Sequence, residues 1–85
     1  MPSKPTKSNE DSKSIQRKKQ LGKNISTLRK KVGFESVIDL TIETDQNASQ
    51  VGRWEAGKGN PTFLNICKLA DALGVSPSEV LKGIE

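Results

Sequence analysis

The stretch from Asn47 to Lys58 places hydrogen-bonding side chains at helical spacing, and both of its ends are marked. Asn47 is suited to the N-cap because its side-chain oxygen accepts a hydrogen bond from a free N–H group of the first turn. Gly57 suits the left-handed residue that ends a helix, and the cation of Lys58 is favourable near a helix C-terminus. These features predict a short helix over residues 47–56.

The two faces of this predicted helix differ. At about 100° per residue, Val51 and Trp54 share one face, which would anchor a small core. The opposite face has one cation among small residues: Ser49, Gly52, Arg53 and Ala56. A small-sided, exposed helix with hydrogen-bonding groups fits the major groove of DNA. The alternative interpretation is an ordinary amphipathic helix whose small outer residues have no function.

The composition excludes several classes of protein. The 85 residues form one domain at most, and a hydrophobic content of 32% suggests that part of the chain is not packed. Cys67 is the single cysteine, and histidine and tyrosine are absent, which argues against a disulfide, a metal site and most acid–base catalysis. We therefore expect no enzyme, no catalytic residue, no metal and no cofactor. Because no apolar run could span a membrane and no signal-peptide core follows Met1, we expect a cytoplasmic protein.

The net charge of +4 is unevenly distributed. Residues 1–20 hold six basic and two acidic residues, so this segment carries the whole excess, and residues 21–85 are balanced at eight of each sign. Residues 1–14 have no apolar residue after Met1 and should be a disordered basic arm. The arm either attracts polyanions without reading sequence or is a solubilising tail. Residues 15–85 would form the folded domain.

Helical periodicity begins at Ile15. Spacings of four, three and four predict a helix over residues 15–32, which Gly33 ends, with a buried face made of Leu21, Ile25, Leu28 and Val32. Gly22 should weaken the middle of this helix by roughly 1 kcal/mol relative to alanine.

Two further helices follow the Asn47 stretch. Thr62 would cap a helix that Gly74 ends, with a buried face of Phe63, Ile66, Leu69, Ala70 and Leu73. Ser76 to Glu79 has the pattern of a capping box with proline at the first helical position, so a short last helix should place Val80 and Leu81 inward.

Residues 36–44 are ambiguous. Their β-branched residues and alternating polarity are typical of a strand, but no second strand-like run exists to pair with it. Val37, Leu40, Thr41 and Thr44 also fit one face of a helix, so we predict a short helix with Ser36 as its N-cap. The turn after it includes Asp45, which tolerates the left-handed backbone that such a turn can require.

Residues 21–81 resemble the Cro and phage-repressor type of helix-turn-helix domain. The resemblance lies in Val51-Gly52-Arg53-Trp54-Glu55-Ala56-Gly57-Lys58-Gly59-Asn60-Pro61, in Leu69-Ala70-Asp71-Ala72-Leu73-Gly74-Val75-Ser76, and in Leu21-Gly22-Lys23-Asn24-Ile25 with Leu28-Arg29. It implies an all-α, compact five-helix bundle, a lambda-repressor-like DNA-binding domain with a basic arm.

The resemblance also implies roles for single residues. The helix at residues 47–56 would be the recognition helix, and Arg29 and Glu55 would form a structural ion pair that joins the first and third helices. Trp54 would be a core residue. The residues expected to meet double-stranded DNA are Asn47, Ala48, Ser49, Gln50, Arg53, Lys58 and Asn60, with Lys18 and Lys19 reaching phosphates from the arm side.

Three departures from the family pattern concern the second helix. Val37 stands where the family usually has a glutamine that contacts phosphate, and one extra residue lies near Glu35. Thr41 and Asp45 replace the usual alanine and glycine of the helix-turn-helix core. These changes leave the angle between the second and third helices open and reduce the polar contacts of the second helix with DNA.

Two functions remain possible from the sequence. The first is a sequence-specific DNA-binding transcriptional regulator, a repressor that occupies a two-fold operator as a weak homodimer through its last helix and nearby loops. The second is a protein-interaction adaptor or antitoxin-like module of the same fold that reads DNA weakly or not at all. Val37, Ala48 and the neutral globular surface favour the second function.

Overall fold

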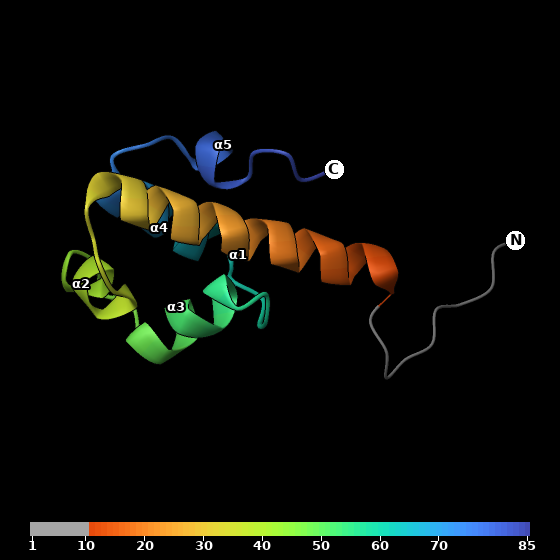
Figure 1. Ribbon diagram of the computed structural model, residues 1–85, viewed down its shortest axis with the longest axis horizontal. Coiled ribbons are helices and arrows are strands. Elements are labelled where there is room, and N and C mark those ends of the chain that lie inside the picture. Colours follow the sequence, from red (N-terminus) through yellow and green to blue (C-terminus); the bar gives the residue numbers. More distant parts are fainter. Residues whose placement is uncertain (1–10) are drawn as a thin grey trace, which may run out of the picture.

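The computed structural model describes residues 11–85, which form five α-helices and no strand (Figure 1). The helices are α1 (Ser12–Val32), α2 (Val37–Ile42), α3 (Ala48–Glu55), α4 (Phe63–Leu73) and α5 (Pro77–Val80). The predicted all-α fold class is therefore confirmed. The expectation of a disordered arm falls mainly on residues 1–10, which lie outside the described residues.

Helix α1 begins three residues earlier than the periodicity predicted. Asp11 is its N-cap, and a carboxylate oxygen of Asp11 accepts a hydrogen bond from the backbone N–H of Ser14 at 2.8 Å. Ser12 to Ser14, which were expected to belong to the arm, are therefore helical, because polar residues need no buried face when a cap satisfies the first turn. The predicted end at Gly33 is confirmed, with φ at 109°.

The ambiguous segment is a helix, as predicted. Ser36 caps α2 by accepting a hydrogen bond from Asp39 N–H at 3.1 Å, and Leu40 is fully buried. The turn after α2 does not use the left-handed backbone that Asp45 could have tolerated, since no residue other than glycine has a positive φ between residues 11 and 85. Asp45 therefore continues the turn in an ordinary backbone conformation.

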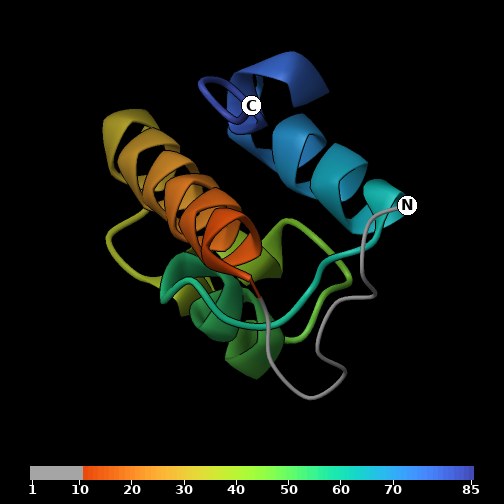
Figure 2. The ribbon, with the colours of Figure 1, turned by 90° about the vertical axis from the view of Figure 1, so that its right-hand side faces the viewer.

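Helix α1 is the central element of the fold. Helices α2 and α3 lie on one side of it, the segment with α5 lies on the other, and α4 runs alongside (Figures 1 and 2). Each helix contributes at least one fully buried aliphatic residue, and the largest of these are Ile25, Leu40, Val51, Leu69 and Val80. Because all five helices contribute to a single core, the orientation of α3 depends on the whole domain.

Three predicted core residues are exposed. Phe63 is 71% exposed, Val32 48% and Leu81 40%, although the buried face of α4 otherwise matches the prediction. Phe63 and Val32 are at helix ends, where the amphipathic pattern continues beyond the surface that covers it. The predicted capping box of α5 is also absent: Ser76 makes no cap hydrogen bond, and its hydroxyl lies 2.7 Å from that of Ser78.

Candidate nucleic-acid interface

Both ends of α3 are fixed by local hydrogen bonds. Asn47 is the N-cap, and its side-chain oxygen accepts from the backbone N–H of Gln50 at 3.1 Å. At the other end, Lys58 N–H donates to the carbonyl oxygen of Arg53 at 2.8 Å, across Gly57, whose φ is +81°. The short helix therefore starts and stops where the sequence predicted, within one residue.

The two faces of α3 are divided as the helical phase required. Val51 is fully buried and Trp54 is 5% exposed, which confirms the core role of the tryptophan. Ser49, Gln50 and Arg53 are exposed. The outer face therefore presents a hydroxyl, a carboxamide and a guanidinium on a rigid helix, a set that can donate to and accept from base edges.

Gly22 allows α3 to lie unusually close to α1. A Cβ atom at Gly22 would be 2.4 Å from the carbonyl oxygen of Trp54 and 2.5 Å from that of Glu55, closer than real contacts permit. The sequence suggested only that Gly22 weakens α1. In the structure this residue is the point where the backbones of the two helices meet, so it sets the distance between them.

The implied ion pair between Arg29 and Glu55 is present and joins the same two helices. Arg29 Nε donates to Glu55 Oε2 at 2.7 Å and Arg29 Nη2 to Glu55 Oε1 at 3.2 Å, which makes the pair bidentate. Arg29 Nη1 also donates to the carbonyl oxygen of Phe34 at 2.9 Å. The two side chains are only 8% and 12% exposed. In such a desolvated site each charge needs the other, and the hydrogen bond to Phe34 satisfies a further N–H group of Arg29.

The loop after α3 brings further predicted residues to the same side. Lys58 and Asn60 are exposed, and Gly59, with φ at +76°, packs against the indole of Trp54. Lys19 of α1 lies beside Gly57, as a Cβ there would be 3.2 Å from Lys19 Cγ. The structure therefore groups Lys19 with the loop at residues 57–60.

Lys18 lies on a groove that Asn60 of this loop also lines. The groove is apolar and lies between α1, the start of α4 and the residues after α5. The groove residues are Arg17, Lys18, Leu21, Asn60, Pro61, Phe63, Ile66, Leu81 and Ile84. Both lysines therefore lie near this loop, Lys19 beside Gly57 and Lys18 on the groove that Asn60 lines, which the run of basic residues in the sequence could not show.

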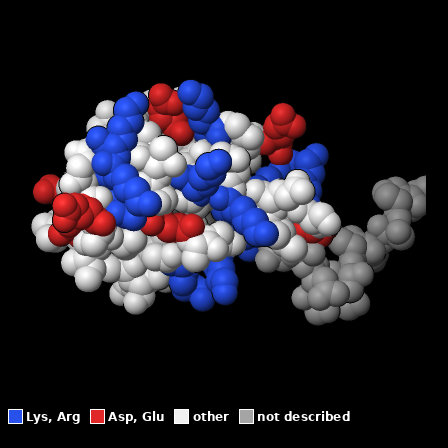
Figure 3. Space-filling view, viewed as in Figure 1, with Lys and Arg blue, Asp and Glu red and all other residues white. Residues whose placement is uncertain are grey.

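Basic and acidic side chains are interspersed over the face shown in Figure 3, without one continuous basic patch. This agrees with the neutral balance of residues 21–85. The globular part would therefore attract DNA through a few local contacts rather than through a strong overall field.

Sequence reasoning missed the residues that tie the α2–α3 turn to α4. Gln46 Nε2 donates to the carbonyl oxygen of Asn65 at 3.0 Å, and Lys68 Nζ lies 3.1 Å from an Asp45 carboxylate oxygen. The hydrogen bond and the charge of Lys68 lower the pKa of Asp45 below its ordinary value. No sequence signal could have found these pairs, because their members are 19 and 23 positions apart on different elements.

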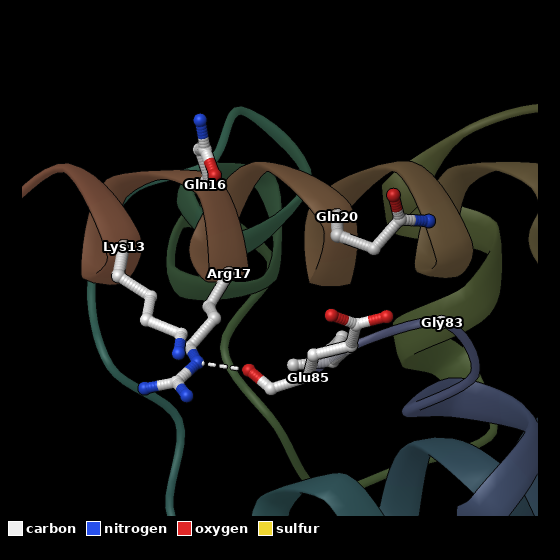
Figure 4. A pocket seen from close by; sticks show the side chains of 7 residues that line it. Lys13, Gln16, Arg17, Gln20, Gly83 and Glu85 are labelled. Atoms are coloured by element: carbon white, nitrogen blue, oxygen red, sulfur yellow. Dashed lines mark hydrogen bonds between the residues drawn. The ribbon is translucent and has the colours of Figure 1, made fainter.

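A further pocket lies between the first turns of α1 and the last described residues, on the side of α1 away from α3 (Figure 4). Arg17 Nε donates there to the backbone carbonyl oxygen of Glu85. None of the predicted DNA-binding residues lines this pocket.

A short helix, a tight turn and a second helix with an exposed polar face define a helix-turn-helix domain, the class of protein to which α2 and α3 point. Residues 44–80 match the family model described as Helix-turn-helix, and this match confirms a domain of the Cro and phage-repressor type. The family is one of DNA-binding transcription regulators. Comparisons with curated proteins and with solved structures found no match. No helix within residues 11–85 is long and apolar enough to cross a lipid bilayer.

Proposed function

We propose that the protein is a sequence-specific transcriptional repressor that acts by occupying an operator. Helix α3 enters the major groove, and Ser49, Gln50 and Arg53 meet base edges and nearby phosphates. The observation that carries this proposal is the exposed polar face of α3 on a helix whose other face is locked by Val51 and Trp54. A rigid helix can hold its readers at fixed positions relative to the bases.

Contacts outside α3 complete the proposed interface. Lys58 and Asn60 meet phosphates next to the groove, and Lys19 lies on the same side. Lys18 is also proposed to reach phosphates, because it lines the same groove as Asn60. Asn47 and Ala48 stand at the start of α3, where Asn47 orients the first turn and Ala48 offers a methyl group. The segment before α1 adds attraction that does not depend on sequence.

The proposed repressor binds as a weak homodimer on a two-fold site, with half-sites about one helical turn apart. The exposed apolar residues Phe63, Leu64 and Leu81 support this part of the proposal. Phe63 and Leu81 border the apolar groove, next to the loop that carries Asn60. The proposed repressor would act in the cytoplasm, where its DNA lies.

Selection from a random DNA pool, followed by titration of the selected duplex, tests the proposal. Arg53→Ala should weaken binding to the selected sequence by about 1–3 kcal/mol, because a guanidinium contact to a base edge is lost. Lys58→Ala should weaken binding to all sequences and reduce the salt slope by about one unit. Lys82→Ala is the control, because Lys82 is exposed in the segment after α5, which lies across α1 from α3.

One observation favours the adaptor as a second candidate. Ile38 and Ile42 of α2 are 65% and 72% exposed, on a helix that should present polar groups to a DNA backbone. Amide chemical-shift mapping with random DNA at low and high salt separates the two functions. Salt-sensitive shifts at residues 48–58 support the repressor. A silent α3, with shifts confined to residues 15–20, would reject DNA reading and favour the adaptor.

A further inference from the structure

The turn between α2 and α3 is shaped by its own threonine. Thr44 N–H donates to the carbonyl oxygen of Thr41 at 3.2 Å, and the Thr44 hydroxyl accepts from Gln46 N–H at 3.0 Å. These bonds fix the path of the chain through the turn without a left-handed residue. They do not fix the direction in which the turn delivers α3, because every partner belongs to the turn or to α2.

A side chain of the turn supplies a connection to another helix. Gln46 Nε2 donates to the carbonyl oxygen of Asn65 in the first turn of α4 at 3.0 Å. Gln46 Oε1 is buried and has no hydrogen-bond partner among the described residues.

The residue that Gln46 contacts is itself fixed. Asn65 N–H donates to the Thr62 hydroxyl at 3.1 Å, and Thr62 N–H donates to Asn65 Oδ1 at 2.9 Å, which completes a capping box. The Asn65 carbonyl is therefore a rigid acceptor at the start of α4. Beside it, Lys68 pairs with Asp45, but both side chains are well exposed, so this pair adds little.

Helix α3 is anchored mainly from its middle to its last residue. Val51 and Trp54 enter the core, Glu55 is paired with Arg29, and Gly22 meets the carbonyl groups of the last turn. The first turn, with Ser49 and Gln50, projects from these anchors toward solvent. A small tilt of α3 about its anchored C-terminal end would therefore move the first turn most. Gln46 lies just before this first turn, and its side chain is hydrogen-bonded to α4.

We propose that Gln46 is a positioning residue for DNA recognition: its bond to Asn65 fixes the start of α3 on α4 and thereby sets how Ser49 and Gln50 meet the bases. This inference rests on the proposed DNA-binding function. It assigns to Gln46 an effect on sequence preference, without any contact between Gln46 and DNA. Losing the bond releases the first turn, so the correct operator loses its advantage while contacts to phosphates persist.

The test compares affinity for a selected operator with affinity for random DNA in the full chain. Gln46→Met keeps the length of the side chain and removes the donor. It should lower the ratio of specific to random affinity about ten-fold, the size of one mismatched base pair. Gln20→Met is the matched control, because Gln20 Nε2 also donates one hydrogen bond, to Asn24 Oδ1 at 2.9 Å, on α1.

A thermal melt of each variant shows that it is folded at the temperature of the titration. Gln46→Glu gives a second variant of the same shape that cannot donate to Asn65 once it is ionised, and it should lower the ratio in the same way. Mere destabilisation would reduce binding to all sequences equally and leave the ratio unchanged. If the wild type selects a sequence but both variants keep its ratio of specific to random affinity, the role of Gln46 is overturned and the proposed DNA-binding function stands. A wild type that selects no sequence overturns the proposed function and the inference with it.

Discussion

The backbone of Gly22 lies against the carbonyl oxygen of Trp54, where a Cβ atom would be 2.4 Å from that oxygen. Both groups are main chain, so neither can rotate away. Helices α1 and α3 consequently pack at a distance that only glycine permits, and the exposed face of α3 stands where this contact leaves it.

Gly22→Ala should therefore destabilise the protein by about 1–3 kcal/mol or more, because α3 must move away from α1. Helix propensity alone predicts the opposite sign, since alanine is the better helix former by roughly 1 kcal/mol. Urea denaturation of the variant measures the free energy of unfolding. The matched control is Gly52→Ala in α3, where an added Cβ meets nothing within 4 Å. Gly52→Ala should be neutral or stabilising, and a stabilised Gly22→Ala would contradict the close contact.

Removing one partner of the pair between Arg29 and Glu55 should cost about 3 kcal/mol or more, because a nearly buried charge is left alone. Glu55→Gln and Arg29→Met are the single variants, and denaturant titration gives the free energy of unfolding of each. The double variant should cost less than the sum of the two, since it buries no unpaired charge. Additive costs would show that the two side chains do not act as a pair.

The pair between Asp45 and Lys68 should make a small, pH-dependent contribution to stability. The hydrogen bond and charge of Lys68 hold the pKa of Asp45 below its ordinary value in the folded state. The pair therefore stabilises the fold above the unfolded-state pKa, and this contribution is lost as the pH falls through the folded-state pKa.

Melting temperatures over a pH series measure this effect. Asp45→Asn should melt below the wild type at about pH 7, and the gap should close at about pH 2, where the wild-type carboxylate is also neutral. Lys68→Met removes the same pair from the other side and should show the same pH dependence. A gap that persists in acid would assign the effect of Asp45→Asn to something other than its charge.

The apolar surface at Phe63 and Leu81 should carry self-association. Phe63→Ser should weaken the dimer in sedimentation equilibrium and reduce cooperative binding to a two-half-site operator. It should leave affinity for a single half-site unchanged. Monomer stability should change by no more than about 0.5 kcal/mol, because Phe63 is 71% exposed. Ile42→Ser is the control, since Ile42 is 72% exposed on α2, and it should leave the dimer intact. If Phe63→Ser and Ile42→Ser weakened the dimer equally, the dimer contact would not be specific to the surface at Phe63 and Leu81.

Local rules in the sequence determined most of the elements and the main face of the site. Helical phase separated Trp54 from Arg53, and caps such as Asn47 and Thr62 marked helix starts, because these signals act over a few neighbouring residues. The same kind of reasoning failed for Phe63 and Leu81. An amphipathic pattern shows which face is apolar but not how far the neighbouring elements extend to cover it.

The sequence by itself thus determined that the folded part within residues 11–85 is helical, that its third helix presents Ser49, Gln50 and Arg53 outward, and which family pattern it resembles. Only the tertiary structure decided that Gly22 is a contact between helices, that Lys19 lies beside Gly57, and that Gln46 is hydrogen-bonded to α4. The physical reason is the separation along the sequence of the residues that interact. Helix signals depend on spacings of three or four residues, whereas packing and cross-element hydrogen bonds join residues 19 or more positions apart.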